Sequence, residues 1–223
     1  MLQVYRQSWL VALIGVVFAS LLEAHPVPRQ SHDRTVVVQV TPSGIVVDYR
    51  LEIDEWTVVY VDLPAVEDKV DLKKLKTPAE FHVAFVRCYG PILARNLSAR
   101  LDGTELEFRC TEQAHRVADH FQCDFRFTAE RDIAVDKEHT LDFRDGNFEL
   151  ESGMLRLSVS NRPETPIVRK SEPDEALKSR PATELKPGDD EKLRKAAVTF
   201  QVEKNGERLG PGDMPIARAK SSP

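Results

Sequence analysis

The sequence is poor in cysteine and aromatic residues, and it lacks several motifs that mark common functions. Of its 223 residues, three are cysteines and 7% are aromatic. There is no CxxC pair, no nucleophile elbow and no phosphate-binding glycine loop. The redox, hydrolase and nucleotide-binding classes that these motifs indicate therefore have no support. After Ala24 no apolar run reaches the ~20 residues that a membrane-spanning helix needs, so none is predicted there.

The chain also lacks a strong charge of either sign. Its net charge is −5, and its acidic and basic residues are interspersed. Nucleic-acid-binding proteins usually carry a basic patch, so we expect no nucleic-acid partner. No group of residues indicates a small-molecule substrate or a reaction, and we expect a non-enzymatic protein. The hydrophobic content of 41% is enough for one domain of ordinary size.

The first 24 residues have the anatomy of a secretory signal peptide. Arg6 gives a positive start, residues 9–22 form an apolar stretch, and Leu22-Glu23-Ala24 offers a small-residue cleavage site. This pattern predicts that residues 1–24 are removed and that the protein is exported to the periplasm or cell envelope. An uncleaved N-terminal membrane anchor is the alternative.

Residues 34–63 predict a β-hairpin that continues into a third extended segment. Pro42-Ser43-Gly44 supplies the reversal, because Pro presets φ at a turn corner and Gly tolerates a positive φ. Apolar and polar residues alternate along the second strand, as in a strand with one solvated face. The apolar set is Val47, Tyr49, Leu51 and Ile53, and the polar set is Asp48, Arg50, Glu52 and Asp54.

One helix is predicted from Thr77 to about Leu97. Thr77-Pro78-Ala79-Glu80 combines a capping Thr, a Pro at the first helical position and a Glu at the third, which is a capping box. Apolar residues then recur at steps of three and four. Pro91 cannot donate to the carbonyl four residues back, so a kink or restart is expected there.

Further strands are predicted around this helix, and Asp102-Gly103 indicates a tight hairpin. We count about seven short strands and one amphipathic helix. Residues 25–161 therefore predict a mainly β (α+β) domain, similar to a β-sandwich, with the helix packed on one side or end. The predicted strands outside residues 34–63 cover 98–101, 105–110, 121–128, 139–143 and 154–160.

Residues 162–223 are rich in proline and charge, a composition that buries little surface. We predict mainly a linker or tail with a disordered end. Residues 197–203 could form a single late strand.

The order of these features resembles the N-terminal extracytoplasmic region of the nickel/cobalt exporter family, the NicO-type permeases. The resemblance covers about residues 20–165 and rests on Ala24-His25-Pro26, the strand VVDYRLEIDE, the helix, LSARLDGTELEF and HTLDFRDGNFELESGMLRLSV. It implies a membrane permease as partner and nickel or cobalt as the ion. The permease part, with its histidine-rich motifs, is absent from this sequence, so no transport residue can be assigned.

Two groups of residues are candidate metal ligands. After cleavage His25 would carry a free amine beside its imidazole, a pair that chelates Cu²⁺ or Ni²⁺, and His32 and Asp33 follow closely. His115, Asp119 and His120 form the second group, in a predicted loop with sequence HRVADH. The alternative for the first group is an N-terminus without a role. The alternative for the second group is a loop that is merely polar. A copper enzyme with an N-terminal histidine brace is a further alternative.

Cys110 and Cys123 lie on neighbouring predicted strands and could form a disulfide in an oxidising compartment. Cys88 would then remain a free thiol.

The sequence thus predicts a non-enzymatic exported domain that binds nickel, cobalt or copper or docks on a membrane permease. The alternative is a structural or interaction domain of the cell envelope without a metal.

Overall fold

The structure is a computed structural model that describes residues 31–54, 57–135, 137–160 and 162–203. The predicted leader, residues 1–24, lies outside the described residues. Ten strands of the described chain form two five-stranded sheets, which confirms the mainly β fold. The first sheet, in spatial order, contains β5 (Arg109–Val117), β6 (Phe121–Glu130), β2 (Gly44–Ile53), β1 (His32–Thr41) and β8 (Leu155–Ser160). The second contains β4 (Thr104–Leu106), β3 (Leu97–Leu101), β7 (Glu138–Asp145), β10 (Lys195–Gln201) and β9 (Ile167–Ser171).

The predicted hairpin is formed by β1 and β2, which pair antiparallel from His32 opposite Ile53 to Thr41 opposite Gly44. Gly44 has a φ of +137°, and a Cβ there would lie 2.1 Å from the carbonyl oxygen of Ala129. Only glycine can therefore occupy this turn beside β6. The alternating apolar residues of β2, which include Val47 and Leu51, are fully buried.

The third extended segment was predicted wrongly. Residues 58–62 form a π-helical turn, η1 (Val58–Asp62), followed by α3 (Leu63–Val66), η2 (Glu67–Lys69) and η3 (Leu72–Lys74). The Asp54 carboxylate accepts hydrogen bonds from the Thr57 backbone N–H at 2.9 Å and from its hydroxyl at 2.7 Å. This capping starts a helical turn where the apolar pattern alone favoured a strand.

The predicted helix is α4 (Pro78–Arg95). Thr77 Oγ1 accepts from the Glu80 N–H at 3.2 Å, and the Glu80 carboxylate accepts from the Lys76 N–H at 2.6 Å. Pro91 lies inside the helix, and the helix continues through it to Arg95. The Asp102-Gly103 turn is also confirmed, with φ values of 50° and 78° that fit a two-residue hairpin.

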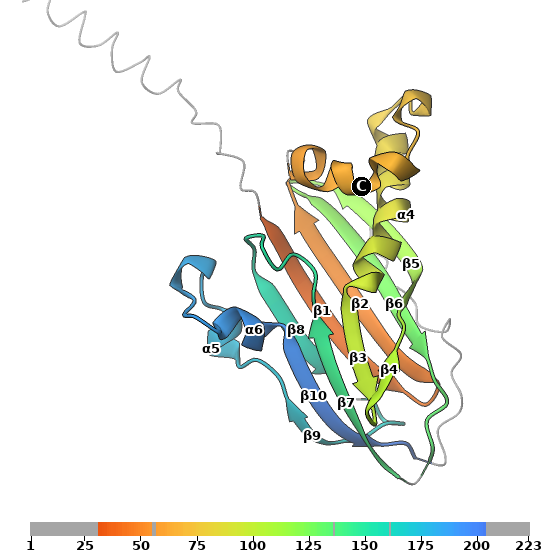
Figure 1. Ribbon diagram of the computed structural model, residues 1–223, viewed down its shortest axis with the longest axis vertical. Coiled ribbons are helices and arrows are strands. Elements are labelled where there is room, and N and C mark those ends of the chain that lie inside the picture. Colours follow the sequence, from red (N-terminus) through yellow and green to blue (C-terminus); the bar gives the residue numbers. More distant parts are fainter. Residues whose placement is uncertain (1–30, 55–56, 136, 161, 204–223) are drawn as a thin grey trace, which may run out of the picture.

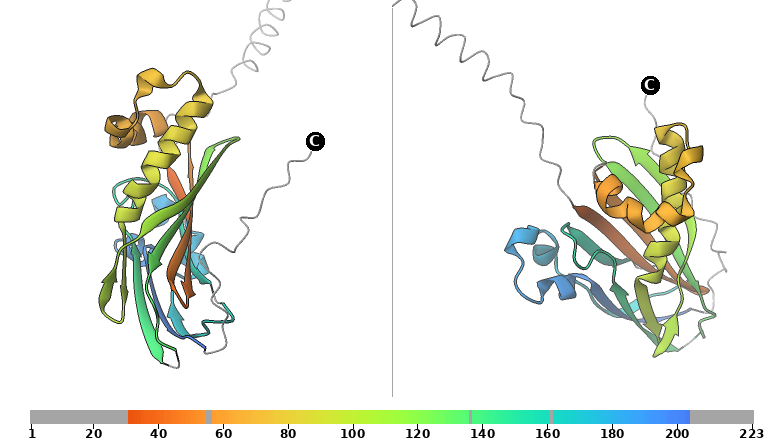
Figure 2. Two further views of the ribbon diagram at one scale, coloured as in Figure 1. Left: turned by 90° about the vertical axis from the view of Figure 1, so that its right-hand side faces the viewer. Right: turned by 45° about the horizontal axis from the view of Figure 1, so that its top comes forward.

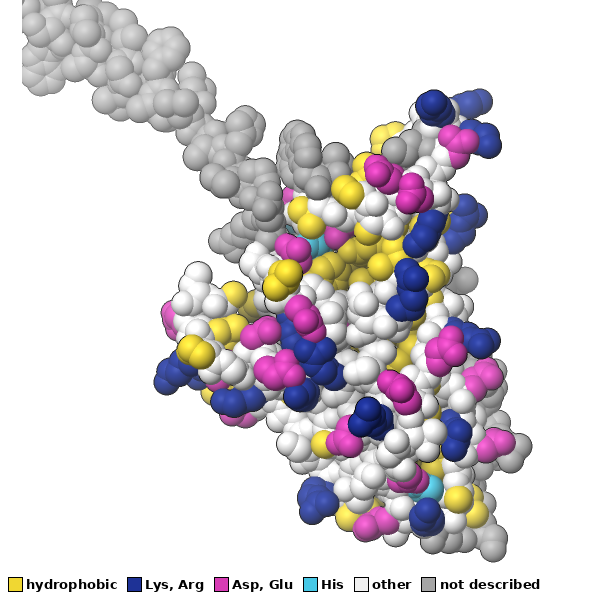
Figure 3. All heavy atoms as spheres, in the orientation of Figure 1, with side chains coloured by type: hydrophobic (Ala, Val, Ile, Leu, Met, Phe, Trp, Pro, Cys, Tyr) yellow, Lys and Arg dark blue, Asp and Glu magenta, His cyan; other side chains and the backbone are white. Residues whose placement is uncertain are grey.

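The two sheets form two layers, as Figures 1 and 2 show. The helix α4 lies over the upper part of β5 and β6, while β3 and β7 cover the lower part of the first sheet (Figure 1). Figure 3 shows hydrophobic side chains gathered in a hollow beneath the helical turns of residues 58–74. Acidic and basic side chains are mixed over the rest of that face.

The region beyond residue 161 differs from the predicted linker. Between β9 and β10 the chain forms α5 (Glu175–Lys178), η4 (Ala182–Glu184) and α6 (Asp189–Leu193). The suggested late strand corresponds to β10, which is hydrogen-bonded to β7 on one side and β9 on the other. Phe200 on β10 is 0% exposed. Residues 162–203 are therefore part of the fold, and residues 204–223 lie outside the described residues.

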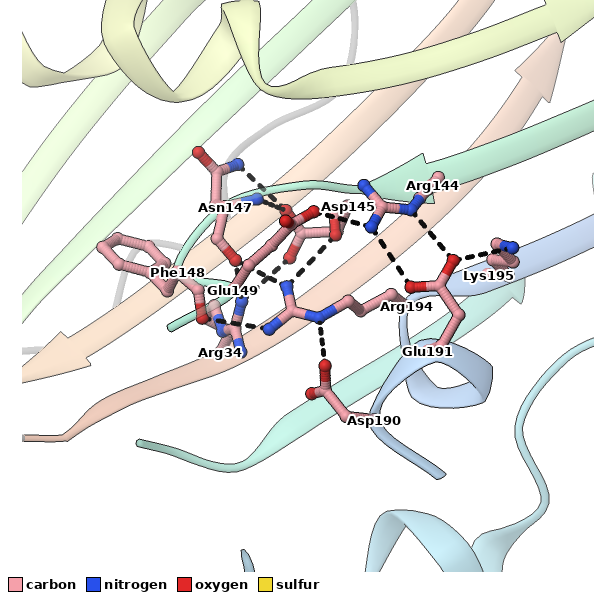
Figure 4. Close-up of polar contacts among 10 residues, drawn as sticks. All are labelled: Arg34, Arg144, Asp145, Asn147, Phe148, Glu149, Asp190, Glu191, Arg194 and Lys195. Carbon is pink, nitrogen blue, oxygen red and sulfur yellow. Dashed lines mark hydrogen bonds and ion pairs between the residues drawn. The ribbon is translucent and has the colours of Figure 1, made fainter. Parts of the chain in front are cut away.

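A buried polar network attaches this region to both sheets (Figure 4). Arg194, 1% exposed, donates to the carbonyl oxygens of Asn147 at 2.6 Å and Phe148 at 2.9 Å. Its Nε donates to the Asp190 carboxylate at 2.8 Å. Arg34 on β1 donates to the same Asn147 carbonyl at 2.5 Å. Two guanidinium groups thus hold one chain segment between the layers.

A second ion-pair group lies beside this network and predicts an acid-sensitive contact. Glu191 accepts hydrogen bonds from Arg144, and its carboxylate forms an ion pair with Lys195 at 2.7 Å. These partners lower the pKa of Glu191 to about 2 from an ordinary 4.5. Because the folded pKa is lowered, the stabilisation is complete above about pH 4.5 and is lost as the pH falls toward 2. Between about pH 4.5 and 2, we expect the free energy of unfolding of the Glu191→Gln variant to fall less than that of the native protein.

Urea unfolding at a series of pH values measures this effect. Glu184→Gln is the control, because Glu184 is exposed in the same region. An unchanged pH dependence in Glu191→Gln would contradict the prediction.

Candidate metal-binding site

The first predicted ligand group is not brought together by the described residues. His25 lies outside them. His32 and Asp33 are consecutive on β1, so their side chains point to opposite faces of the sheet. The Asp33 carboxylate accepts a hydrogen bond from the Met154 N–H at 2.7 Å. His32 is only 1% exposed.

His32 belongs to a buried cluster that fixes the helical turns to the sheet. Its Nε2 lies 3.1 Å from both carboxylate oxygens of Asp62, which ends η1. The Tyr89 hydroxyl of α4 donates to the same carboxylate at 2.5 Å. Burial and the Asp62 charge raise the pKa of Tyr89, so this hydroxyl keeps its proton. A carboxylate accepts hydrogen bonds, so Nε2 of His32 is the donor.

Nδ1 of His32 is not accessible as a metal ligand. A carboxylate behind the other ring nitrogen is the usual support of a metal-bound histidine. However, Nδ1 is buried without a hydrogen-bond partner, and the ring stacks on Phe148 with centroids 4.1 Å apart. In this conformation the cluster of His32, Asp62 and Tyr89 is a structural support.

The second predicted ligand group is divided by the structure. The HRVADH segment was predicted as a loop, but β5 extends through Val117, so His115 lies on a strand. Asp119 and His120 follow in the exposed turn between β5 and β6. Among the described residues no three His, Cys, Asp or Glu side chains converge as a metal site. His115 is therefore separated from the two residues with which it was grouped.

The structure gives His115 a different histidine as its neighbour. His82 on α4 faces His115 on β5, with ring centroids 5.9 Å apart. Both rings lie beside Phe121, at centroid distances of 4.7 Å for His82 and 5.9 Å for His115. Both histidines are partly buried. The separation of these two residues in the sequence did not indicate that they would be neighbours.

Close packing of α4 on β5 produces this arrangement. At Gly90 a Cβ would lie 2.6 Å from Sγ of Cys110, so a larger residue here would force the helix or the Cys110 side chain to shift. Phe85 and Phe121 are buried in contact beneath the first half of the helix, with centroids 5.9 Å apart. His82 lies one turn before Phe85 and so projects toward the same strand.

The distance between the two rings suits one shared metal ion. A metal–nitrogen bond of about 2.0–2.1 Å allows ring centroids roughly 4.5 to 6.4 Å apart, depending on the angle at the metal. The observed 5.9 Å falls in that range. Imidazole is a good ligand for nickel, copper and zinc ions. Two nitrogen donors from α4 and β5 could therefore hold such an ion at this surface.

The predicted Cys110–Cys123 disulfide is absent, and all three cysteines are free. Cys110 lies opposite Phe127 and Cys123 opposite His115, so the two cysteines are four positions apart along neighbouring strands. At about 3.3 Å per residue this separation is roughly 13 Å, beyond the ~7 Å limit for a disulfide. Burial also raises the pKa of Cys110 to about 11, so its reactive thiolate is scarce.

Comparisons with protein-family models, with curated proteins and with solved structures gave no match. In the described part of the chain, no helix has both the length and the apolar character needed to cross a membrane.

Proposed function

We propose that this protein is an exported, non-enzymatic domain of the cell envelope that binds a transition-metal ion between α4 and β5. The observation that carries this proposal is the His82–His115 pair, with ring centroids 5.9 Å apart. The leader-like residues 1–24 and the resemblance to the extracytoplasmic part of nickel/cobalt exporters support the same function. Nickel, cobalt and copper are the candidate ions, and a membrane permease is the candidate partner.

The chemistry of the pair suits reversible binding. Both donors are neutral nitrogen ligands, and the pair leaves the other coordination positions of the ion open. A partner that offers further ligands can therefore take the ion through those positions. Such a site would serve a protein that collects or hands over ions.

Titration calorimetry with Ni²⁺, Co²⁺ and Cu²⁺ tests this function. We expect the purified protein to bind at least one of these ions with a micromolar Kd. His82→Ala and His115→Ala should each weaken binding at least tenfold, because each removes one of two protein ligands. His25→Ala and His120→Ala are the matched controls and should bind as the native protein does.

Two results would contradict the proposal. Binding weaker than millimolar for all three ions would leave the second candidate, an interaction domain without a metal. That candidate is favoured by two exposed valines on α4 and β5, Val83 and Val117. Binding lost in His25→Ala but kept in His82→Ala would place the ion at the N-terminus.

A further inference from the structure

The His82–His115 pair supplies too few ligands to complete a metal site. Transition-metal ions of this class usually take four or more ligands. Within the described residues no third His, Cys, Asp or Glu side chain joins the pair. We infer that a second copy of this chain completes the site, so that one ion is shared by two copies through His82 and His115 of each. This inference rests on the proposed function.

A second copy can supply the ligands because the pair lies on an open edge. β5 is the outermost strand of the first sheet, and its outer edge has no strand partner in the described chain. Figure 1 shows α4 and β5 next to each other at the right-hand side of the described chain. Two copies related by a twofold axis present the same patch to each other, so two histidines become four.

Each histidine of the pair has an exposed valine close to it in the sequence. The described residues include five large hydrophobic side chains that are exposed, and Val83 and Val117 are two of them, at 55% and 46%. Val83 follows His82, and Val117 lies on the same face of β5 as His115. Arg116 points to the opposite face, where it donates to Gln122. No charge from Arg116 therefore lies between the two copies.

The metal is needed for this association because the apolar contact is small. A stable protein interface buries about 1,200–2,000 Å², far more than two valines per copy provide. Four imidazole–metal bonds would supply the binding free energy that the small apolar contact cannot provide. Metal-dependent dimerisation follows, with one ion per two chains.

Sedimentation velocity and calorimetry on the full protein test the inference. In EDTA we expect a monomer, and with Ni²⁺, Co²⁺ or Cu²⁺ a dimer that is complete at half an equivalent of ion per chain. His82→Ala and His115→Ala should stay monomeric with metal present. His25→Ala should dimerise as the native protein does.

A variant with Val83→Lys and Val117→Lys separates the dimer from the metal site. It keeps both histidines but places like charges across the twofold axis. We expect it to bind one ion per chain, at least tenfold more weakly, and to remain monomeric. Circular dichroism melts of all variants show whether each is folded.

The outcomes distinguish the inference from the proposed function. One ion per native chain with an unchanged mass would overturn the shared site and leave the proposed function intact. A native dimer that persists in EDTA would overturn the metal bridge. No binding of any ion would overturn both.

Discussion

We expect the Arg194→Met variant to be less stable than the native protein by about 3 to 5 kcal/mol. The side chain is 1% exposed and donates to three backbone carbonyls, those of Asp145, Asn147 and Phe148. Methionine has similar length but no donor, so buried acceptors would be left without partners. Each unsatisfied buried acceptor costs about 1–3 kcal/mol. Removing one partner from a buried charged network costs about 3–5 kcal/mol, which agrees with the loss expected for Arg194→Met.

Thermal unfolding measures this loss. For a domain of this size each kcal/mol lowers Tm by about 2–4 °C, so the expected fall is roughly 6 to 20 °C. Arg156→Met is the matched control, because Arg156 is exposed on β8. Its stability should change by no more than about 0.5 kcal/mol. Equal stability of Arg194→Met and Arg156→Met would show that the network contributes nothing.

Local patterns in the sequence predicted the parts of the fold that local forces determine. The alternation around Val47 and Leu51 gave β2, the Thr77 capping box gave α4, and Asp102-Gly103 gave the hairpin. In each case neighbouring residues contain the physical cause. The turn at η1 was missed because the Asp54 side chain competes with the strand pattern that precedes it.

The second sheet was underestimated because composition was averaged over residues 162–223. The prolines and charges lie mainly in loops and short helices, and they hide the strand β9. β9 is an edge strand on which only Ile167 is even partly buried, so it has no apolar alternation to detect. The Arg194 network depends on backbone carbonyls far away in sequence, and no local pattern predicts such contacts.

The candidate site was half predicted for a similar reason. His115 was selected as a metal ligand, but its neighbours in sequence, Asp119 and His120, lie in the turn beyond β5. Its neighbour in space is His82 on α4. Only the packing of α4 on β5 places the two rings together. The alternation of β5 could have placed His115 on one face, but not the helix above it.

Ending the chain after residue 161 should prevent stable folding. This deletion removes β10, the strand between β7 and β9, and with it Leu193, Val198, Phe200 and Val202, all buried. At about 1.5–3 kcal/mol for each large apolar side chain, the loss is roughly 6 to 12 kcal/mol. That is comparable with the total stability of a typical domain, about 5–15 kcal/mol. It would also leave β7 as an unpaired edge with Leu141 and Phe143 exposed.

Urea unfolding followed by circular dichroism compares this shortened chain with one that ends after residue 203. The longer chain retains every strand that the structure describes, and we expect it to unfold in one cooperative transition. We expect the shorter chain to show no such transition and to aggregate through its exposed sheet. Phe200→Ala in the full protein isolates one contribution and should cost about 3–5 kcal/mol, while Gln201→Ala on the exposed face should cost little. A cooperative transition of native midpoint in the chain ending at 161 would mean that β9 and β10 are dispensable. The linker that the composition predicted would then describe residues 162–223 better than the fold does.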